Sequence, residues 1–327
     1  MSKPGQPRRI GRGPSPRVAA HHAFPAFSAF SLAIATLAAG PAHAVTPPPA
    51  PVSVSGPVLQ HIQQSGVIRI AHRESSVPFS FVVDGKPMGY AVDLCLRVAD
   101  AVRGALKMPA LKVEWVPVTP ANRIAAVADG KADLECGSTT NNSERRAQVA
   151  FTIPHYIAGS RMIVKTSSGI HKWADLRGRT VVSTIGTTPL AMVRKLDESG
   201  VMQLKVIEAK DHAEAFAMVE SGKADAFVMD DVLLYGLRAN AKDPSAYTVT
   251  GDMLTVEPYA IMLSKHDPEF KKVVDKALVS SIYDQDTQKL YKKWFQSPIP
   301  PHNITLDIPM SYLLRDSFKY PSDKVAD

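Results

Sequence analysis

The sequence predicts an α/β fold of two lobes, each a mostly parallel sheet flanked by helices. The chain has 327 residues, a length that suits about two compact lobes rather than one small core. Runs of strand character alternate with segments of helical periodicity, an order typical of βαβ units and parallel sheets. One such unit occurs twice in the chain, which favours two lobes of the same architecture with a cleft between them.

The repeated unit consists of a strand, a helix and a second strand. In the first copy Leu111-Lys112-Val113 opens a strand, and Gly130-Lys131-Ala132-Asp133 joins the helix to the next strand. In the second copy Leu204-Lys205-Val206 and Gly222-Lys223-Ala224-Asp225 occupy the same places. Glycine is a typical residue at the C-terminal end of a helix. A common helix-to-strand turn would explain the Gly-Lys-Ala-Asp strings alone, but the matched strands favour duplication of the whole unit.

Further elements follow from hydrophobic periodicity. Strands are expected at Val67–Ala71, Met162–Lys165 and Thr180–Ser183. Apolar residues recur at helical spacing from Phe270 to Ile282, and a second helix begins near Asp286. These elements supply both predicted lobes with strands and with covering helices.

Composition indicates a globular protein whose folded part is nearly neutral. Apolar residues make up 45% and charged residues 21%, which excludes disorder, collagen and coiled coil for the whole chain. The formal net charge is +7, from 38 Lys and Arg against 31 Asp and Glu. Five basic residues and no acidic ones lie in residues 1–44, so the remainder holds 33 basic residues against 31 acidic ones. This near balance predicts no nucleic-acid partner.

Residues 1–44 have the order of a secretory signal peptide. A basic stretch precedes the apolar run Phe24–Ala39, and small residues at Ala42 and Ala44 follow it. The run is shorter than the ~20 residues that span a bilayer, which argues against the alternative of an uncleaved anchor. We expect cleavage after Ala44 and a soluble, exported product. The Pro-rich residues 45–57 are expected to form an extended linker.

Polar side chains gather where the predicted strands end, which is where open α/β sheets bind ligands. The charged members of this set are Arg73, Arg123, Arg145 and Asp230, which would give a pocket a charge of +2. The uncharged members are Ser138, Thr140, Thr187, Thr188 and His212. Guanidinium groups pair with carboxylates, and hydroxyls at helix N-termini favour anions. Because an aspartate suits an ammonium group, the set predicts a site for a small zwitterion with an extra carboxylate.

Each of these residues also has a purely structural interpretation. The arginines could be surface charges, although three on analogous loops favour a site. Thr187 and Thr188 could cap a helix, a role compatible with ligand contact, and Asp230 could cap the next one. His212 could be a loop residue without a role, and Gly186 could be a plain turn rather than a point of close backbone approach.

Cys95 and Cys136 are the only cysteines, too few for a disulfide scaffold or a zinc ribbon. In an oxidising compartment they could form a disulfide that contributes about 3–4 kcal/mol. The alternative is a pair of buried thiols, and the sequence does not decide between the two. With no metal-spaced histidine pair, phosphate loop or nucleophile elbow, the sequence predicts no metal and no cofactor.

An ordered set of strings extends from about Val58 to the C-terminus. Two long strings are His72–Ser80 and Glu135–Asn142. The shorter ones are Asn122–Ile124, Ser183–Thr188, Ala209–His212, Phe227–Asp231, Lys293–Phe295 and Pro298–Pro301. The set resembles the family-3 extracellular solute-binding proteins of polar amino-acid ABC transporters, and the long strings resemble members that bind glutamate and aspartate. The resemblance implies a type II periplasmic binding protein that closes on its ligand.

Carried over by position, the resemblance implies roles for the polar residues. Arg145 would grip the α-carboxylate of the amino acid, with Ser138 and Thr140 beside it. Asp230 would hold the α-ammonium group.

The remaining roles concern the side-chain carboxylate of the ligand. Arg73 and Arg123 would bind it, while Thr188 and His212 would complete the pocket from the second lobe. The chain departs from the usual pattern at Pro120, where these family members usually have a hydroxyl residue three before the arginine. Loss of that donor could weaken binding or relax selectivity.

The resemblance also implies how the chain is organised. The first lobe would contain residues 58–157 and 259–327, and the second residues 158–258. The two lobes would join at a hinge near Ile157–Ser160 and Glu257–Tyr259.

The implied function is the solute-binding component of an ABC importer for L-glutamate and L-aspartate. We expect a monomer, not an enzyme, that delivers its ligand to the transmembrane subunits of a permease. Two alternatives stay open. One is a periplasmic dehydratase on the same scaffold, with Glu74 and His212 as acid and base, and the other is a ligand-sensing component.

Overall fold

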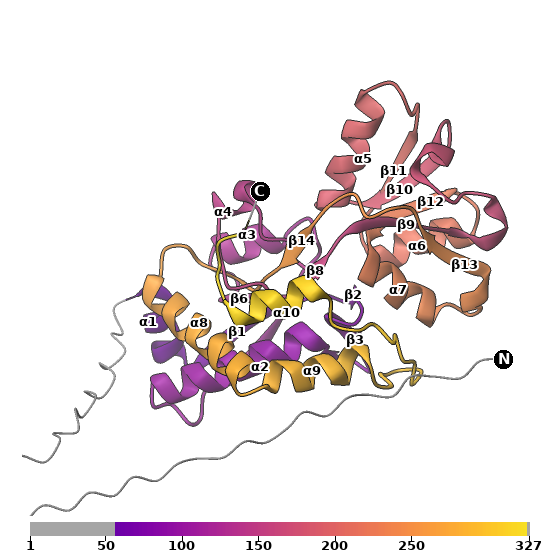
Figure 1. Ribbon diagram of the computed structural model, residues 1–327. Helices are drawn as coiled ribbons and strands as arrows, with labels where there is room; N and C mark the ends of the chain where they lie inside the picture. Colours follow the sequence, from indigo (N-terminus) through magenta and orange to yellow (C-terminus); the bar gives the residue numbers. More distant parts are fainter. Residues whose placement is uncertain (1–55, 326–327) are drawn as a thin grey trace, which may run out of the picture. The chain divides into compact units, whose positions relative to one another are not determined.

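The computed structural model describes residues 56–325, which belong to one compact unit, Ala50–Asp327 (Figure 1). The predicted signal peptide and most of the predicted linker lie outside the described residues. Helix α1 (Pro57–Ser65) begins at the last residue assigned to the linker, because proline fits the first turn of a helix. Within residues 56–325, no helix is long and apolar enough to cross a membrane.

A five-stranded sheet forms the centre of the first lobe. Its strands, in spatial order, are β5 (Lys112–Pro117), β1 (Val67–His72), β6 (Leu134–Cys136), β15 (Met262–Leu263) and β7 (Ala150–Phe151). Strand β1 pairs in parallel with both β5 and β6, whereas β15 is antiparallel to β6 and β7.

A second five-stranded sheet forms the centre of the second lobe. Its strands, in spatial order, are β11 (Lys205–Ala209), β10 (Thr180–Thr184), β12 (Ala226–Asp230), β9 (Ser160–Lys165) and β13 (Tyr247–Thr250). Strand β10 is parallel to its two neighbours, and β9 is antiparallel to both of its own. In each sheet four strands therefore run in the same direction and one, β15 or β9, runs opposite to them, so the expectation of mostly parallel sheets is confirmed.

The Gly-Lys-Ala-Asp repeat forms the same turn in both lobes. Asp133 accepts a hydrogen bond from the backbone N–H of Arg69 at 2.7 Å, and Asp225 accepts one from that of Thr180 at 2.8 Å. Each aspartate also donates its own N–H to the carbonyl of the same residue. The turn thereby ties β6 to β1 in the first lobe and β12 to β10 in the second, an equivalent arrangement that agrees with duplication.

Helices cover both sheets. In the first lobe α2 (Tyr90–Ala105), α8 (Pro268–Tyr283) and α9 (Asp286–Phe295) lie side by side (Figure 1). The helices α5 (Thr188–Glu198), α6 (His212–Glu220) and α7 (Asp231–Asn240) gather around the second sheet. The helices expected after Phe270 and near Asp286 are confirmed as α8 and α9.

Shorter elements complete the chain. A small antiparallel sheet contains β2 (Ser75–Ser76), β3 (Ser80–Val83) and β4 (Lys86–Met88). Three short helices belong to the first lobe: α3 (Arg123–Ala128), α4 (Ser143–Arg146) and α10 (Tyr312–Lys319). Three 3₁₀ turns span Thr166–Ser168, Trp173–Leu176 and Pro244–Ala246.

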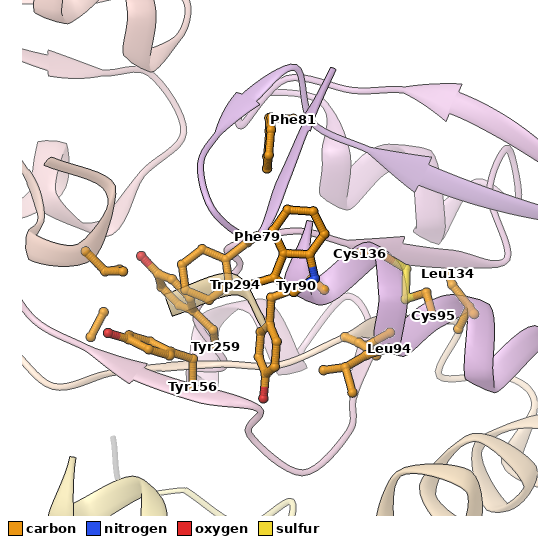
Figure 2. Packing of buried hydrophobic residues seen from close by; sticks show 14 of the residues in the cluster. Phe79, Phe81, Tyr90, Leu94, Cys95, Leu134, Cys136, Tyr156, Tyr259 and Trp294 are labelled. Carbon is orange, nitrogen blue, oxygen red and sulfur yellow. A yellow bond between two sulfur atoms is a disulfide. The ribbon is translucent and has the colours of Figure 1, made fainter. Parts of the chain in front are cut away.

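Two antiparallel strands connect the lobes. Strand β8 (Tyr156–Ala158) pairs with β14 (Glu257–Tyr259), with Ile157 opposite Pro258. These strands fall at the two predicted hinge segments. An aromatic cluster holds their ends, because the ring of Phe79 lies 5.0 Å from that of Tyr156 and 5.1 Å from that of Tyr259 (Figure 2). The cluster fixes Tyr259 within the core of the first lobe.

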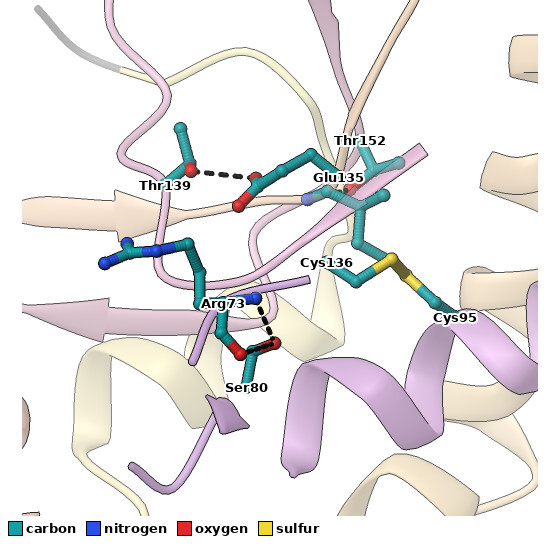
Figure 3. Close-up of a disulfide and its surroundings, with 8 residues drawn as sticks. Arg73, Ser80, Cys95, Glu135, Cys136, Thr139 and Thr152 are labelled. Atoms are coloured by element: carbon teal, nitrogen blue, oxygen red, sulfur yellow. Dashed lines mark hydrogen bonds between the residues drawn. A yellow bond between two sulfur atoms is a disulfide. The ribbon is translucent and has the colours of Figure 1, made fainter. Parts of the chain in front are cut away.

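A disulfide joins helix α2 to strand β6. Cys95 and Cys136 are bonded, with their Cα atoms 6.3 Å apart and a sequence separation of 41 (Figure 3). The bond anchors the end of β6, from which the polar loop Gly137–Asn142 begins.

Candidate functional site

The three predicted arginines converge from three separate elements of the first lobe. Arg73 follows β1, Arg123 is the first residue of α3, and Arg145 lies in α4, and their residues are only 1%, 2% and 6% exposed. Arg123 Nη1 donates to the Ser138 carbonyl at 3.3 Å, and Arg145 Nη1 donates to the Thr140 carbonyl at 2.9 Å. The loop after β6 therefore orients two of the guanidinium groups through its backbone.

The guanidinium groups lie close enough to influence one another. Burial, followed by the charge of Arg123, lowers the pKa of Arg73 to about 9 and that of Arg145 to about 10. Burial also lowers the pKa of Arg123. These are large displacements for arginine, whose charge is normally fixed. The cluster is therefore a concentrated positive centre that desolvation makes costly unless anions accompany it.

Asp230 provides a carboxylate at the end of β12. Its Oδ2 accepts a hydrogen bond from the Tyr259 hydroxyl, and its side chain makes no capping bond to α7 although the residue stands at the N-cap position. Burial and the neighbouring Glu257 raise the pKa of Asp230 well above its usual range. A nearby ammonium group would favour the ionised form of this carboxylate. The structure thus directs Asp230 away from the capping role.

His212 is the first residue of α6 and is 1% exposed. Its Nδ1 lies 2.9 Å from the Thr184 hydroxyl. Burial, with the charges of Arg73 and Arg123, holds the pKa of His212 well below its usual range. The ring is therefore neutral at pH 7, and these two arginines of the first lobe face it from across the site.

The hydroxyl residues divide into two groups. Ser138 and Thr140 are buried beside the arginines, and Ser138 Oγ donates to Ser76 Oγ at 3.4 Å. Thr188 donates to Glu257 Oε2 at 2.8 Å and is only partly buried. Thr187, by contrast, caps α5 by accepting from the Leu190 N–H and donates its own proton to the Thr184 carbonyl. Its hydroxyl serves the local backbone.

Three buried residues join this site without having been predicted as members. Glu135 lies in the middle of β6, while Glu257 and Tyr259 lie on β14. All three are at most 3% exposed. With two further carboxylates, the predicted pocket charge of +2 is incomplete, because the ionised side chains sum to a formal charge of zero. A charged residue within the short strand Leu134–Cys136 was the one available signal, and nothing local marks Glu257 or Tyr259.

Several buried polar atoms of the site have no hydrogen-bond partner among the described residues. They are Arg73 Nη1, Arg123 Nε, Glu135 Oε1, His212 Nε2 and Asp230 Oδ1. Buried polar atoms are normally satisfied, and an unsatisfied one costs about 1–3 kcal/mol. The donors lie on the two arginines and the imidazole, and the two acceptors lie on Glu135 and Asp230. A ligand that satisfies these atoms would offer carboxylate oxygens to the unpaired donors and an ammonium group to Asp230.

Two cavities adjoin the site. One of about 110 Å³ is lined by Glu74, Ser75 and Thr119 of the first lobe and Asp211 of the second. The other, of about 690 Å³, is lined by Thr140, Thr188, Glu257 and residues of the C-terminal segment, among others. Because both lobes contribute walls, access depends on how far the lobes are closed.

The lobes touch through backbone at the mouth of the site. Gly186 has φ +79°, and a Cβ atom there would lie 2.6 Å from the Pro120 carbonyl oxygen. Arg145 Nη2 also donates to the Gly186 carbonyl at 3.2 Å. Gly186 is thus both a turn that requires a left-handed conformation and a point of close approach. Pro120, the departure noted in the sequence, forms part of this closing contact through its backbone.

The described residues give no sign of a metal centre. Within 56–325, no group of three or more His, Cys, Asp or Glu side chains is arranged to hold a metal ion.

The convergent arginines, the opposing aspartate and the enclosure between two hinged α/β lobes define a two-lobe binding protein for a small anionic or zwitterionic solute.

Comparison with known proteins agrees with this class. The model of the bacterial extracellular solute-binding proteins, family 3, matches residues 68–297, and the chain belongs to that family. The chain is 44% identical to an L-glutamate/L-aspartate-binding protein of Pseudomonas aeruginosa, over 82% of this chain and 90% of that protein. It is 42% identical to a glutamate/aspartate import solute-binding protein of Salmonella typhimurium, over 88% of this chain and 94% of the relative.

Solved structures share the fold. An arginine-binding protein mutant from T. maritima aligns with a TM-score of 0.65 and 26% identity, covering 72% of this chain and 98% of that one. An ancestral arginine-binding protein bound to arginine aligns with a TM-score of 0.62 and 30% identity, covering 70% of this chain and 98% of that one. The type II two-lobe architecture predicted from the sequence is thereby confirmed.

Proposed function

We propose that this chain is the solute-binding component of an ABC importer for acidic amino acids, glutamate and aspartate. The observation that carries the proposal is the convergence of Arg73, Arg123 and Arg145 on one buried site that faces Asp230. A neutral amino acid would use one guanidinium for its carboxylate and leave the others unpaired. A dicarboxylic amino acid supplies an anionic group for each side of the cluster.

The residues divide the ligand between them. Arg145 binds the α-carboxylate together with the hydroxyls of Ser138 and Thr140, and Asp230 takes the α-ammonium group. Tyr259 holds Asp230 in place through its hydroxyl. The α-carboxylate and α-ammonium groups are common to all α-amino acids, so these contacts contribute affinity but do not discriminate between ligand side chains.

Discrimination between ligand side chains depends on the part of the site that faces the ligand's side-chain carboxylate. Arg73 and Arg123 bind the side-chain carboxylate, and the neutral His212 donates through Nε2 while its Nδ1 accepts from the Thr184 hydroxyl. An amide side chain would offer these donors a weaker, uncharged acceptor, so the hydrogen bonds from the two guanidinium groups would lose part of their charge assistance. The site therefore favours glutamate or aspartate over glutamine or asparagine.

Closure of the lobes completes binding. We propose that residues 58–157 and 259–327 form one rigid body, that residues 158–258 form the other, and that the paired strands β8 and β14 act as the hinge. The contact of Gly186 with Pro120 and the bond from Arg145 to Gly186 support a closed state that encloses the ligand. In this proposal the protein is a periplasmic monomer after removal of residues 1–44, and the closed form delivers its solute to the permease.

A ligand panel tests the proposal. Protein recovered from the periplasmic fraction is unfolded and refolded to remove bound solute, then titrated calorimetrically with glutamate, aspartate, glutamine, asparagine and arginine. We expect the two acidic amino acids to bind at least about 100-fold more tightly than their amides, a difference of about 3 kcal/mol. Preference for an amide or for arginine would reject the proposed ligand class.

The Arg73→Ala variant tests the assignment of the side-chain end. It leaves a ligand carboxylate buried without its partner, so we expect loss of glutamate binding by several kcal/mol. The matched control is Arg97→Ala, which removes a partly exposed arginine of the same lobe that pairs with Asp286. Near-native glutamate affinity in Arg73→Ala would exclude Arg73 from the site.

A further inference from the structure

Glu135 is a carboxylate in an apolar part of a sheet. It lies on the central strand β6, where its register partners are Ala71 on β1 and Met262 on β15, both fully buried. Glu135 itself is 0% exposed. Placing a charge there costs several kcal/mol of desolvation, and neither neighbour on the sheet can offset it. The sheet alone therefore gives no reason for a glutamate at this position.

The groups that face Glu135 come from the ligand site. Thr139 donates to Glu135 Oε2 at 2.8 Å, while Oε1 has no hydrogen-bond partner among the described residues. The charges that act on the carboxylate are those of Arg123, Arg73 and Arg145, and burial raises its pKa against their effect. Figure 3 shows the side chains of Arg73 and Glu135 extending to the same side, away from the disulfide.

The carboxylate acts on these arginines without pairing with them. No ion pair within 4 Å joins Glu135 to an arginine among residues 56–325. A direct salt bridge would occupy the guanidinium donors that a ligand carboxylate needs. At a longer distance in a buried site, a negative charge still stabilises the protonated arginines.

The arginines need such a counter-charge. Arg123 lowers the pKa of both Arg73 and Arg145, so its charge destabilises the protonated form of the other two. Arg73 also faces Asp211 and Tyr259, and Arg145 also faces Glu257 and Asp230. Glu135 is the one acidic residue that opposes this loss of charge at all three arginines.

We propose that Glu135 is a positioning residue, the shared counter-charge that keeps the three arginines protonated and convergent while leaving their donors free for ligand carboxylates. This inference rests on the proposed function of the same site. It explains why a charged residue occupies the position on β6 whose register partners are the apolar residues Ala71 and Met262. It also explains the glycine that follows Cys136, because a Cβ atom at Gly137 would collide with Glu135 Oε1 and lie 3.1 Å from Arg73 Cγ.

The test is the pH dependence of glutamate binding in Glu135→Gln. This change removes the charge but keeps the size of the side chain and an oxygen that can accept from Thr139. The dissociation constant is measured calorimetrically from pH 6.5 to 10. We define the alkaline limit of binding as the pH above which glutamate affinity begins to fall. We expect this limit to be lower by about one pH unit in Glu135→Gln, because arginines without their counter-charge lose protons more easily. The ligand's own ammonium group is common to all variants and cancels in the comparison.

Two further variants separate charge from structure. Glu144→Gln removes the same charge from an exposed position next to Arg145 and is expected to keep the wild-type limit. Glu135→Asp keeps the buried charge and is expected to restore the wild-type limit even if its affinity is lower at every pH. If Glu135→Gln does not fold, Glu135→Met replaces it, since methionine suits the apolar neighbours and also lacks the charge.

The outcomes are distinct. An unchanged alkaline limit in Glu135→Gln or Glu135→Met overturns the inference, as does an equal loss of affinity at all pH values in Glu135→Gln and Glu135→Asp. Both results leave the proposed function standing, provided that the wild type binds glutamate. Failure of the wild type to bind any acidic amino acid instead rejects the proposed function itself.

Discussion

The two lobes are built on the same unit but contribute opposite charges to the site. The three strands that pair in parallel have the same spatial order in both sheets, and the Gly-Lys-Ala-Asp turn makes the same backbone hydrogen bonds in both. After the strands the lobes differ, because the first supplies all three arginines and the second supplies Asp230 and a neutral His212. The comparison teaches that the scaffold fixes where side chains gather, while the segments after the strands decide which charges each lobe contributes.

The disulfide is a structural difference between the lobes. Strand β6 is bonded to α2 through Cys136, whereas the equivalent strand β12 has no cysteine. Closing a loop of 41 residues contributes about 4 kcal/mol in the chain-entropy model. We expect Cys95→Ala combined with Cys136→Ala to lower the free energy of unfolding by about that amount in urea titrations. A loss below about 1 kcal/mol would show that packing around α2 already fixes β6.

Gly186→Ala tests the contact between the lobes rather than either lobe alone. The new Cβ atom would meet the Pro120 carbonyl oxygen, so the closed state is penalised and glutamate binding should weaken by about 10- to 100-fold. The control is Gly222→Ala in the same lobe, where φ is +76° and the nearest atom is a flexible lysine nitrogen at 3.7 Å. Both variants carry the same backbone strain, so equal losses of affinity would contradict a closing role for Gly186.

Replacing the repeated aspartates compares the two turns directly. The Asp133 side chain is 2% exposed and accepts three hydrogen bonds from Arg69, whereas that of Asp225 is 37% exposed. We expect Asp133→Asn to cost about 2–3 kcal/mol of stability and Asp225→Asn less than about 1 kcal/mol. Equal costs in chemical denaturation would mean that the backbone bond shared by both turns, not the buried ion pair, carries the stabilisation.

A buried histidine outside the site makes the first lobe sensitive to acid. Burial lowers the pKa of His155 to about 3, and neither of its ring nitrogens has a hydrogen-bond partner among the described residues. The unfolded chain takes up this proton below pH ~6.5 and the native protein does not, so stability falls as the pH drops from about 6.5 towards 3. The contribution of His155 to that slope is about 1.4 kcal/mol per pH unit.

His155→Phe removes this contribution. We expect the slope of the free energy of unfolding against pH, between pH 6.5 and 5, to decrease by an amount that corresponds to about one proton. Urea unfolding of ligand-free protein at several pH values measures the slope. The exposed His171 of the second lobe supplies the control, since His171→Asn should leave the slope as in the wild type. A slope unaffected by His155→Phe would place the acid sensitivity elsewhere.

Much of the fold could be predicted because it is local. Alternating strands and helices, the repeated turn and the amphipathic helices α8 and α9 follow from periodicity and capping within short segments. The antiparallel strands were harder to predict, since β15 is two residues long and comes from far along the chain to complete the first sheet. No window of sequence around Met262 contains its partners.

The site residues also fall into those that local sequence could predict and those that depend on distant parts of the chain. Arg73, Arg123, Arg145 and Asp230 follow strands, so their convergence could be expected from the rule that ligands bind where strands end. Glu257 and Tyr259 lie on the connecting strand β14, and they reach Thr188 and Asp230 only because the chain crosses between the lobes twice. Thr187 looked equivalent to Thr188, but the geometry of the helix start gives its hydroxyl to the backbone instead.

The sequence by itself determined the architecture, the positive cluster and the class of solute that such a cluster suits, because those follow from periodicity and from residue chemistry at strand ends. Only the tertiary structure decided which carboxylates share the site, since burial and distance set electrostatic coupling and neither can be deduced from spacing. Glu135 lies one residue from a cysteine in the chain. Its proposed role depends on three guanidinium groups that separate elements of the first lobe bring close to it.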